Sequence, residues 1–258
     1  MDRQVMAAVL TAAGGEGPAV AVATVVESSG EMPLGTMAAL TADGDLIGEL
    51  PPALADGLRP AMAAALAGHA STTLRVDTAE GHVDVLIEVT EPPEELIVVG
   101  GGHIGRSLSL IGAHLGLAVT VIDDRETYAN RERFPEAARV ICGDFVDSLR
   151  SLRLGPSTYV VVVTRGHKQD ELALAEVVGN AARYVGMIGS KRRVRAVMQH
   201  LEATGISPEL LALVHSPIGV DIGAETPEEI AVSILAEIVR ERRVSHLMAA
   251  RRRRGNTS

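Results

Sequence analysis

Short apolar runs of strand length and segments with helical spacing of apolar residues divide the chain into two parts. The first part ends near residue 90. Its patterns predict helices over residues 1–13 and 51–67, and strands over residues 19–26, 37–40, 46–50, 72–77 and 82–90. Asp43-Gly44 lies between two of these strands and is typical of a hairpin turn. We therefore predict a small α+β domain over residues 1–90.

The second part begins after Glu91-Pro92-Pro93-Glu94-Glu95, a linker whose prolines cannot donate to a sheet. From residue 96 to about 245, strand and helix patterns alternate. Strands are predicted near 96–99, 118–122, 139–142, 158–163 and 183–187, and a weaker pattern near 212–215 allows a sixth. Helices are predicted near 103–115, 144–153, 169–180, 190–203 and 227–243. This alternation predicts an α/β fold with a doubly wound parallel sheet, preceded by the small α+β domain.

The first predicted strand of the second domain ends on a glycine-rich turn, Gly100-Gly101-Gly102-His103-Ile104-Gly105. A helical segment, a second strand and then Asp123-Asp124 follow. This is the order of a dinucleotide-binding βαβ unit, in which the glycines admit a pyrophosphate to a helix N-terminus and an acidic residue, here Asp123, holds a ribose. The competing interpretation is a doubly wound domain that keeps the turn for packing and binds nothing there.

Polar residues gather at the predicted carboxyl edge of the sheet, where ligands of such folds bind. The candidate binding residues are Gly100, Gly101, Gly102, His103, Ile104, Gly105, Asp123, Asp124, Asp144, Thr164, Arg165, Ser190 and Lys191. Ser190 resembles a helix N-cap, yet Lys191-Arg192-Arg193 fills the first turn against the helix dipole, so we expect either a bound anion or a solvated basic face. His167 is a weak catalytic candidate, since the sequence places no acid or nucleophile with it. The eight histidines show no metal-binding spacing, so no metal site is predicted.

Composition narrows the function classes. A net charge of −9 and only 2 % aromatic residues argue against nucleic acid or an anionic membrane as the main partner. The single cysteine, Cys142, is expected to be a buried thiol at a strand end. We expect no signal peptide and no membrane span, and hence a cytoplasmic protein. The arginine-rich residues 246–258 are expected to form a disordered, solvated tail.

The second domain resembles the Rossmann domain of the XdhC/CoxI proteins, which are accessory or maturation factors for xanthine and carbon monoxide dehydrogenases. Five segments carry the resemblance, and the run from His215 to Ala231, HSPIGVDIGAETPEEIA, is the most specific. The others are 96–105, 121–125, 159–170 and 184–193. Residues 21–35 are similar to the family's first strand and loop. The family's glycine–glycine–cysteine segment is replaced here by Gly48-Glu49-Leu50 and two prolines, without a cysteine.

The resemblance implies a factor that binds molybdenum cofactor, in its molybdopterin or nucleotide form, and hands it to an apo-enzyme. It implies a molybdenum hydroxylase as client and a cysteine desulfurase as a further partner, and we expect a homodimer. Because the cysteine is missing, a divergent relative that binds only a nucleotide stays open. Two other classes also stay open: an NAD(P)-dependent oxidoreductase that uses the same glycine turn, and a nucleotide-sensing regulatory module.

Overall fold

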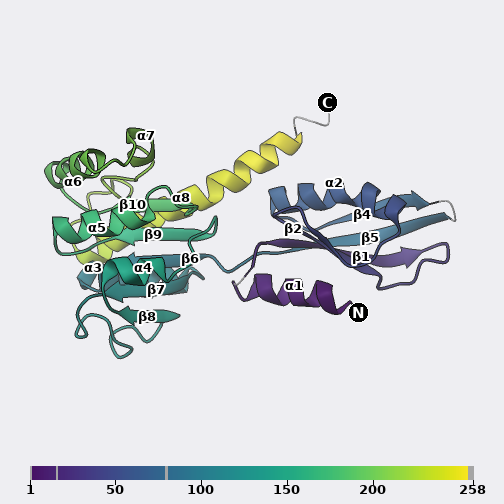
Figure 1. Ribbon diagram of the computed structural model, residues 1–258, viewed down its shortest axis with the longest axis horizontal. Coiled ribbons are helices and arrows are strands. Elements are labelled where there is room, and N and C mark those ends of the chain that lie inside the picture. Colours follow the sequence, from purple (N-terminus) through teal and green to yellow (C-terminus); the bar gives the residue numbers. More distant parts are fainter. Residues whose placement is uncertain (1, 16, 79–80, 255–258) are drawn as a thin grey trace. The chain divides into compact units, whose positions relative to one another are not determined.

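The computed structural model describes residues 2–15, 17–78 and 81–254. It consists of two compact units. One is formed by the chain up to Pro93 together with the residues from Val244 on, and the other by Glu94–Arg243. We call them the N-terminal unit and the Rossmann unit (Figure 1).

The N-terminal unit contains an antiparallel sheet with the strand order β3-β2-β1-β5-β4. Its elements are α1 (Arg3–Ala13), β1 (Val20–Ser28), β2 (Met37–Thr41), β3 (Leu46–Ile47), α2 (Pro52–Gly68), β4 (Thr72–Thr78) and β5 (Gly81–Thr90). Successive side chains of β1 point to opposite faces of the sheet. Ala21, Ala23 and Val25 pack with the apolar side of α2, whereas Val20 and Val22 pack with Val5 and Ala12 of α1. The α+β domain predicted from the sequence is therefore present, with one helix on each face.

The Rossmann unit contains a parallel sheet with the strand order β10-β9-β6-β7-β8. Its elements are β6 (Glu95–Val99), α3 (His103–His114), β7 (Ala118–Asp123), β8 (Arg139–Cys142), α4 (Phe145–Arg150), β9 (Thr158–Val162), α5 (His167–Val177), β10 (Tyr184–Met187), α6 (Lys191–Ala203), α7 (Pro208–Leu211) and, as far as Arg243, α8 (Pro227–Arg254). The order reverses between β6 and β9, which is the topological switch point of a doubly wound fold. This confirms the predicted fold class.

Helices cover both faces of this sheet. Leu96 and Val98 of β6 pack with α3 and α8, while Ile97 and Val99 of the same strand pack with α4, α5 and α6. β6 is thus apolar on both sides, as its uninterrupted apolar run predicts. The glycine turn therefore follows directly on four fully buried residues, 96–99.

Helix α8 begins as its sequence predicts. The backbone N–H of Glu229 donates to the Thr226 hydroxyl at 3.3 Å, and the N–H of Thr226 donates back to the Glu229 carboxylate at 3.0 Å, which completes a capping box. The helix continues to Arg254, whereas its sequence pattern predicts an end near residue 243 and a disordered tail over 246–258. Arg and Ala favour helix, and Gly255 is the first helix breaker after Pro227, which explains the greater length. The last residues of the predicted tail, 255–258, lie outside the described part of the chain.

Two further details differ from the sequence-based predictions. The sixth strand is reduced to a single parallel bridge between Gly186 and His215, because the short helix α7 takes up the preceding residues. Cys142 is exposed rather than buried. Its strand, β8, lies at the edge of the sheet and is not covered as the central strands are. Neither the strand order nor α7 is evident from local patterns.

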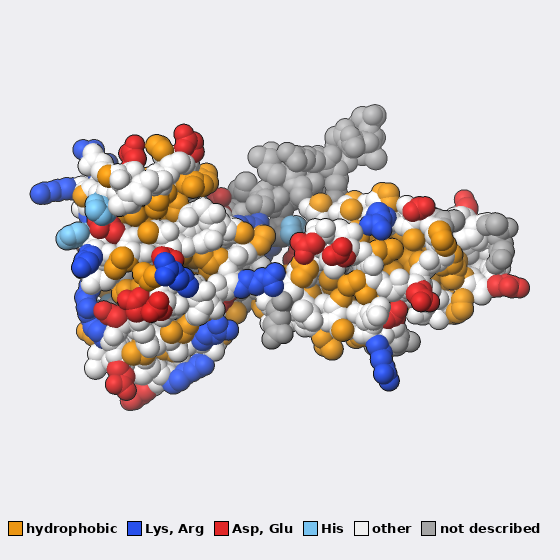
Figure 2. All heavy atoms as spheres, viewed as in Figure 1, with side chains coloured by type: hydrophobic (Ala, Val, Ile, Leu, Met, Phe, Trp, Pro, Cys, Tyr) orange, Lys and Arg blue, Asp and Glu red, His pale blue; other side chains and the backbone are white. Residues whose placement is uncertain are grey.

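Two observations concern the apolar and the charged character of the molecule. Among the helices in the described ranges, none combines the length and apolar character that a membrane crossing requires. On the face shown in Figure 2, Lys and Arg side chains of the Rossmann unit are interspersed with Asp and Glu. Local ion pairs, among them that of Arg165 with Asp124, account for part of this mixture.

Candidate functional site

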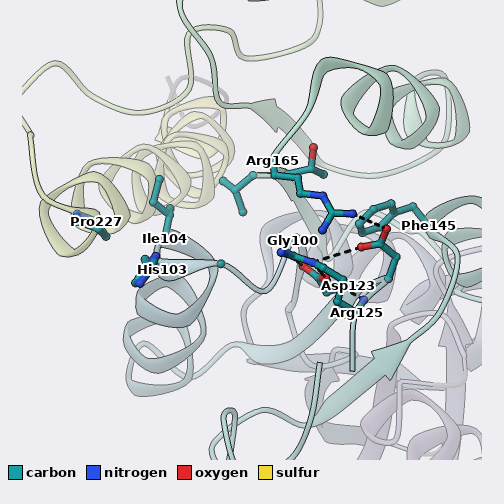
Figure 3. Close-up of a pocket in the computed structure, with 12 residues that line it drawn as sticks. Gly100, His103, Ile104, Asp123, Arg125, Phe145, Arg165 and Pro227 are labelled. Atoms are coloured by element: carbon teal, nitrogen blue, oxygen red, sulfur yellow. Dashed lines mark hydrogen bonds and ion pairs between the residues drawn. The ribbon is translucent and has the colours of Figure 1, made fainter. Parts of the chain in front are cut away.

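A pocket of about 280 Å³ opens at the carboxyl end of the sheet, at the switch point between β6 and β9. Its lining comes from the turn after β6, the end of β7, the loop after β9 and the starts of α4 and α8. The lining residues are Gly100, Gly102, His103, Ile104, Asp123, Asp124, Arg125, Phe145, Val163, Thr164, Arg165 and Pro227. In Figure 3, His103, Ile104 and Pro227 lie on one side of Gly100, and Asp123, Arg125 and Phe145 lie on the other. Eight of the predicted binding residues line this pocket: Gly100, Gly102, His103, Ile104, Asp123, Asp124, Thr164 and Arg165.

The glycines of the turn differ in what an added side chain would meet. Gly100 has a φ of +118°, and a Cβ there would lie 2.6 Å from the carbonyl oxygen of Val163. A Cβ on Gly105 would lie 2.0 Å from the carbonyl oxygen of Gly100, so this glycine lets α3 pack closely on the turn. A Cβ on Gly102 would meet nothing within 4 Å, although Gly102 lines the pocket. Packing therefore requires a glycine at Gly100 and Gly105, and leaves Gly102 as the position where a ligand can approach the backbone.

The N-terminus of α3 faces the same pocket. Gly102 is the N-cap residue and no side chain caps the helix there. The first N–H groups of a helix have no partner within it, and together with the helix dipole they favour an anion. The open side of Gly102 and the uncapped helix thus form a cradle that fits a phosphate.

Asp123 holds the turn in place. It is 1 % exposed, and its carboxylate accepts four hydrogen bonds. The donors are the N–H of Gly101 at 2.8 Å, the N–H of Arg125 at 3.1 Å, and Nε and Nη2 of Arg125 at 2.8 and 3.0 Å. A carboxylate offers about four acceptor sites, so these donors saturate it. Asp123 therefore has no free oxygen lone pair for the ribose that the sequence assigned to it.

The charge of Asp123 contributes to stability. Burial acts to raise its pKa, but the bonds from Arg125 and from the N–H of Gly101 outweigh burial, so the pKa lies below its ordinary value of 3.8. A carboxyl group whose pKa is lower in the folded than in the unfolded state stabilises the fold above its unfolded pKa, and this contribution is lost as the pH falls.

We expect Asp123→Asn to lower the free energy of unfolding at neutral pH by about 1.5 to 2 kcal/mol, because an amide cannot accept all four bonds from charged and backbone donors. Urea unfolding of both proteins at several pH values measures this. The difference in free energy of unfolding should shrink as the pH falls below 3.8, because the stabilisation by the charged carboxylate of the wild type is lost there. A pH-independent difference would contradict a role for the charge.

Asp124 and Arg165 form an ion pair beside the saturated Asp123. Nη2 of Arg165 donates to Oδ2 of Asp124 at 3.1 Å, and Arg165 extends across the pocket in Figure 3, where a dashed line marks this contact. The side chains of Arg165 and Asp124 are 49 % and 34 % exposed, respectively. Arg125 lies 3.6 Å from the other oxygen of Asp124 and stacks over the Tyr128 ring at 3.7 Å from its centre. Arg125 is therefore fixed on two sides, whereas Arg165 is held by one exposed carboxylate.

Thr164 joins the loop after β9 to the neighbouring helices. Its hydroxyl donates to the buried Asp170 at 2.6 Å, and Nε of Arg193 donates to the other oxygen of Asp170 at 2.7 Å. The Ser190 hydroxyl caps α6 by accepting from the N–H of Arg193. Ser190 and Lys191 do not line the pocket. Asp170 thus balances Arg193, one of the three basic residues at the start of α6.

The remaining predicted residues also lie outside the pocket lining. The Asp144 carboxylate caps α4 by accepting from the N–H groups of Val146 and Asp147. Gly101 is buried, and its N–H donates to the Asp123 carboxylate. His167 is exposed at the start of α5. The structure therefore does not bring His167 to the pocket, so His167 is not placed to donate a proton to a ligand there.

Four lining residues are not among those predicted from the sequence: Arg125, Phe145, Val163 and Pro227. Arg125 directly follows Asp124, and Pro227 opens α8, so both are adjacent to features that the sequence does indicate. Val163 and Phe145 carry no polar signal and are recognisable only from the fold. Within residues 2–15, 17–78 and 81–254, no group of three or more His, Cys, Asp or Glu residues could hold a metal ion.

The fold and the pocket define a Rossmann-type protein with a glycine-rich turn beside a pocket at its switch point. Residues 96–238 match the family model described as the XdhC Rossmann domain, which is more than half of the 258 residues. The chain belongs to the XdhC family.

The relatives agree with this assignment. The chain is 32 % identical over 160 residues to the uncharacterised protein YqeB of Escherichia coli K12, covering 62 % of this chain and 29 % of that protein. It is 30 % identical over 172 residues to a Bacillus subtilis protein described as a probable xanthine dehydrogenase subunit, covering 67 % of this chain and 50 % of that protein. The chain thus spans at most about half the length of these curated relatives. A crystal structure described as a xanthine dehydrogenase from Bacillus halodurans shares the fold, with a TM-score of 0.54 and 21 % identity over 93 % of this chain and 96 % of that one.

Proposed function

We propose that this protein is an accessory or maturation factor for a molybdenum hydroxylase of the xanthine dehydrogenase type. It binds the molybdenum cofactor or a nucleotide at the Rossmann pocket and hands it to the apo-enzyme. Membership of the XdhC family carries this proposal, because relatives of the chain are described in terms of xanthine dehydrogenase.

The pocket fits the phosphate end of such a cofactor. Molybdopterin carries a phosphate, which is extended by a nucleotide in some forms. The open approach at Gly102 and the uncapped start of α3 would hold this phosphate, and Arg165 would contact it from the opposite wall. The bound cofactor supplies the redox-active molybdenum centre of the client enzyme. The lining residues include no cysteine, so the pocket suits the phosphate and nucleotide portion rather than the metal itself.

The other two classes make different demands on the pocket. A hydride-transferring enzyme needs a proton donor or acceptor beside the ligand, and His167, the candidate from the sequence, is not part of the lining. A nucleotide sensor would change its oligomeric state on binding without any chemistry. Turnover of NAD(P)H would favour the enzyme, and ligand-dependent assembly without turnover would favour the sensor.

Deleting the gene in its native host tests the proposed role. We expect the client hydroxylase to accumulate as protein but to lose most of its activity and its bound pterin. A plasmid carrying the wild-type gene should restore both. Full hydroxylase activity and pterin content in the deletion strain would contradict the proposal.

A further inference from the structure

The two neighbouring carboxylates at the end of β7 differ in what they can still bind. Asp123 is 1 % exposed and its acceptor sites are filled by Gly101 and Arg125. The Asp124 side chain is 34 % exposed, lines the pocket, and accepts a hydrogen bond from one arginine, Arg165. Of the two, Asp124 has acceptor positions that open into the pocket.

The charges of the pocket are balanced in pairs when no ligand is bound. Asp123 is neutralised by Arg125, which uses both Nε and Nη2 for this contact and rests on the Tyr128 ring. Asp124 is paired with Arg165, whose side chain is 49 % exposed and can adopt other rotamers, and Arg125 lies farther away, 3.6 Å from its other oxygen. The second pair is the easier to separate, since an exposed ion pair contributes little.

We propose that Asp124, rather than Asp123, binds the 2′,3′-diol of a ribose, and that Arg165 leaves Asp124 to bind the phosphate of the same ligand. One ion pair is thereby exchanged for two contacts with the ligand. This inference rests on the nucleotide binding put forward above and specifies its chemistry. A ligand with a diol alone, or with a phosphate alone, must break the ion pair without gaining both contacts. The pocket therefore selects ribonucleotides over pyrophosphate, deoxynucleotides and 2′-phosphorylated nucleotides, which would place a second anion against Asp124.

Calorimetric titration of the whole protein tests this with defined probes. The four ribonucleoside diphosphates ADP, GDP, CDP and UDP are compared first, and the one that binds most tightly is compared with its 2′-deoxy form. Wild-type protein should bind the deoxy form about 10-fold more weakly or worse, because a hydrogen bond to a carboxylate is lost.

Three variants assign the effect to a residue. Asp124→Ala should abolish the preference for the ribose and should also bind inorganic pyrophosphate more tightly, by up to about five-fold, because Arg165 is released. Asp123→Asn should keep the preference for the ribose. Glu126→Ala removes an exposed carboxylate from the same loop, outside the pocket lining, and controls for a general change in charge.

Asp124→Ala is expected to lose the ribose preference and to bind pyrophosphate more tightly. A protein that had merely unfolded would bind both ligands more weakly. An Asp124→Ala protein that keeps the ribose preference, or an Asp123→Asn protein that loses it, would overturn this inference. If the wild type binds pyrophosphate but does not distinguish ribose from deoxyribose, only this inference fails. If it binds neither pyrophosphate nor any of the four nucleotides, the proposed nucleotide binding fails as well.

Discussion

The Gly105→Ala variant should be less stable than the wild type by about 3 kcal/mol, even though alanine favours a helix more than glycine does. Gly105 lies in the first turn of α3, where propensity alone would make alanine stabilising by up to about 1 kcal/mol. Its Cβ would lie 2.0 Å from the carbonyl oxygen of Gly100 and 3.4 Å from Cγ1 of Val98. Backbone must move to relieve the first contact, and overpacking of this kind costs about 1 to 3 kcal/mol or more.

Thermal unfolding measures this loss. A decrease in Tm of about 6 to 12 °C is expected for a domain of this size. Gly102→Ala is the matched control, because it adds the same methyl group three residues earlier and meets nothing within 4 Å. A Gly105→Ala protein as stable as this control would contradict the close packing of α3 on the glycine turn.

The Gly102→Val variant should have the opposite behaviour: nearly intact stability and impaired ligand binding. The added side chain enters open space in the pocket, at the position where a phosphate would approach the N–H groups of α3. Valine is a poorer N-cap residue than glycine, so a loss of stability below about 1 kcal/mol is expected. Obstruction of the cradle should weaken the binding of pyrophosphate and nucleoside diphosphates by about 10- to 100-fold, or about 1.4 to 2.8 kcal/mol.

Titration of pyrophosphate into the wild type, Gly102→Ala and Gly102→Val measures this effect. Affinity should fall in the order of side-chain size. Equal affinity in all three proteins would show that no phosphate binds at the turn. The pair of glycine variants therefore separates the packing role of the motif from its binding role.

The sequence predicts the fold well because its signals are local. The apolar run before Gly100 indicates a buried strand, and Thr226-Pro227 with Glu229 indicates the start of α8, which the capping box confirms. Each signal depends on residues a few positions apart. The order of the strands depends on residues far apart in the sequence, so local patterns do not show that β8 is an edge strand. For this reason the prediction that Cys142 is buried is wrong.

The site is only partly predictable because its polar residues are used by distant partners. Asp123 lies where a ribose-binding carboxylate is expected. Its oxygens, however, already accept hydrogen bonds from Arg125 and from Gly101, which is 22 residues away. Likewise, Arg193 at the start of α6 pairs with Asp170 rather than with a ligand. The sequence indicates which residues lie at the edge of the sheet, whereas their hydrogen bonds decide which of them remain free to bind.

If the pocket of the Rossmann unit holds a phosphate-bearing, nucleotide-like cofactor, that compound should be purified together with the protein. Mass spectrometry of the small molecules released from protein purified from its native host, with wild type and Gly102→Val compared in parallel, tests this. We expect a stoichiometric nucleotide or molybdopterin with the wild type and its loss from Gly102→Val. Wild-type protein that releases neither compound, or a Gly102→Val protein that retains the compound in full, would contradict it.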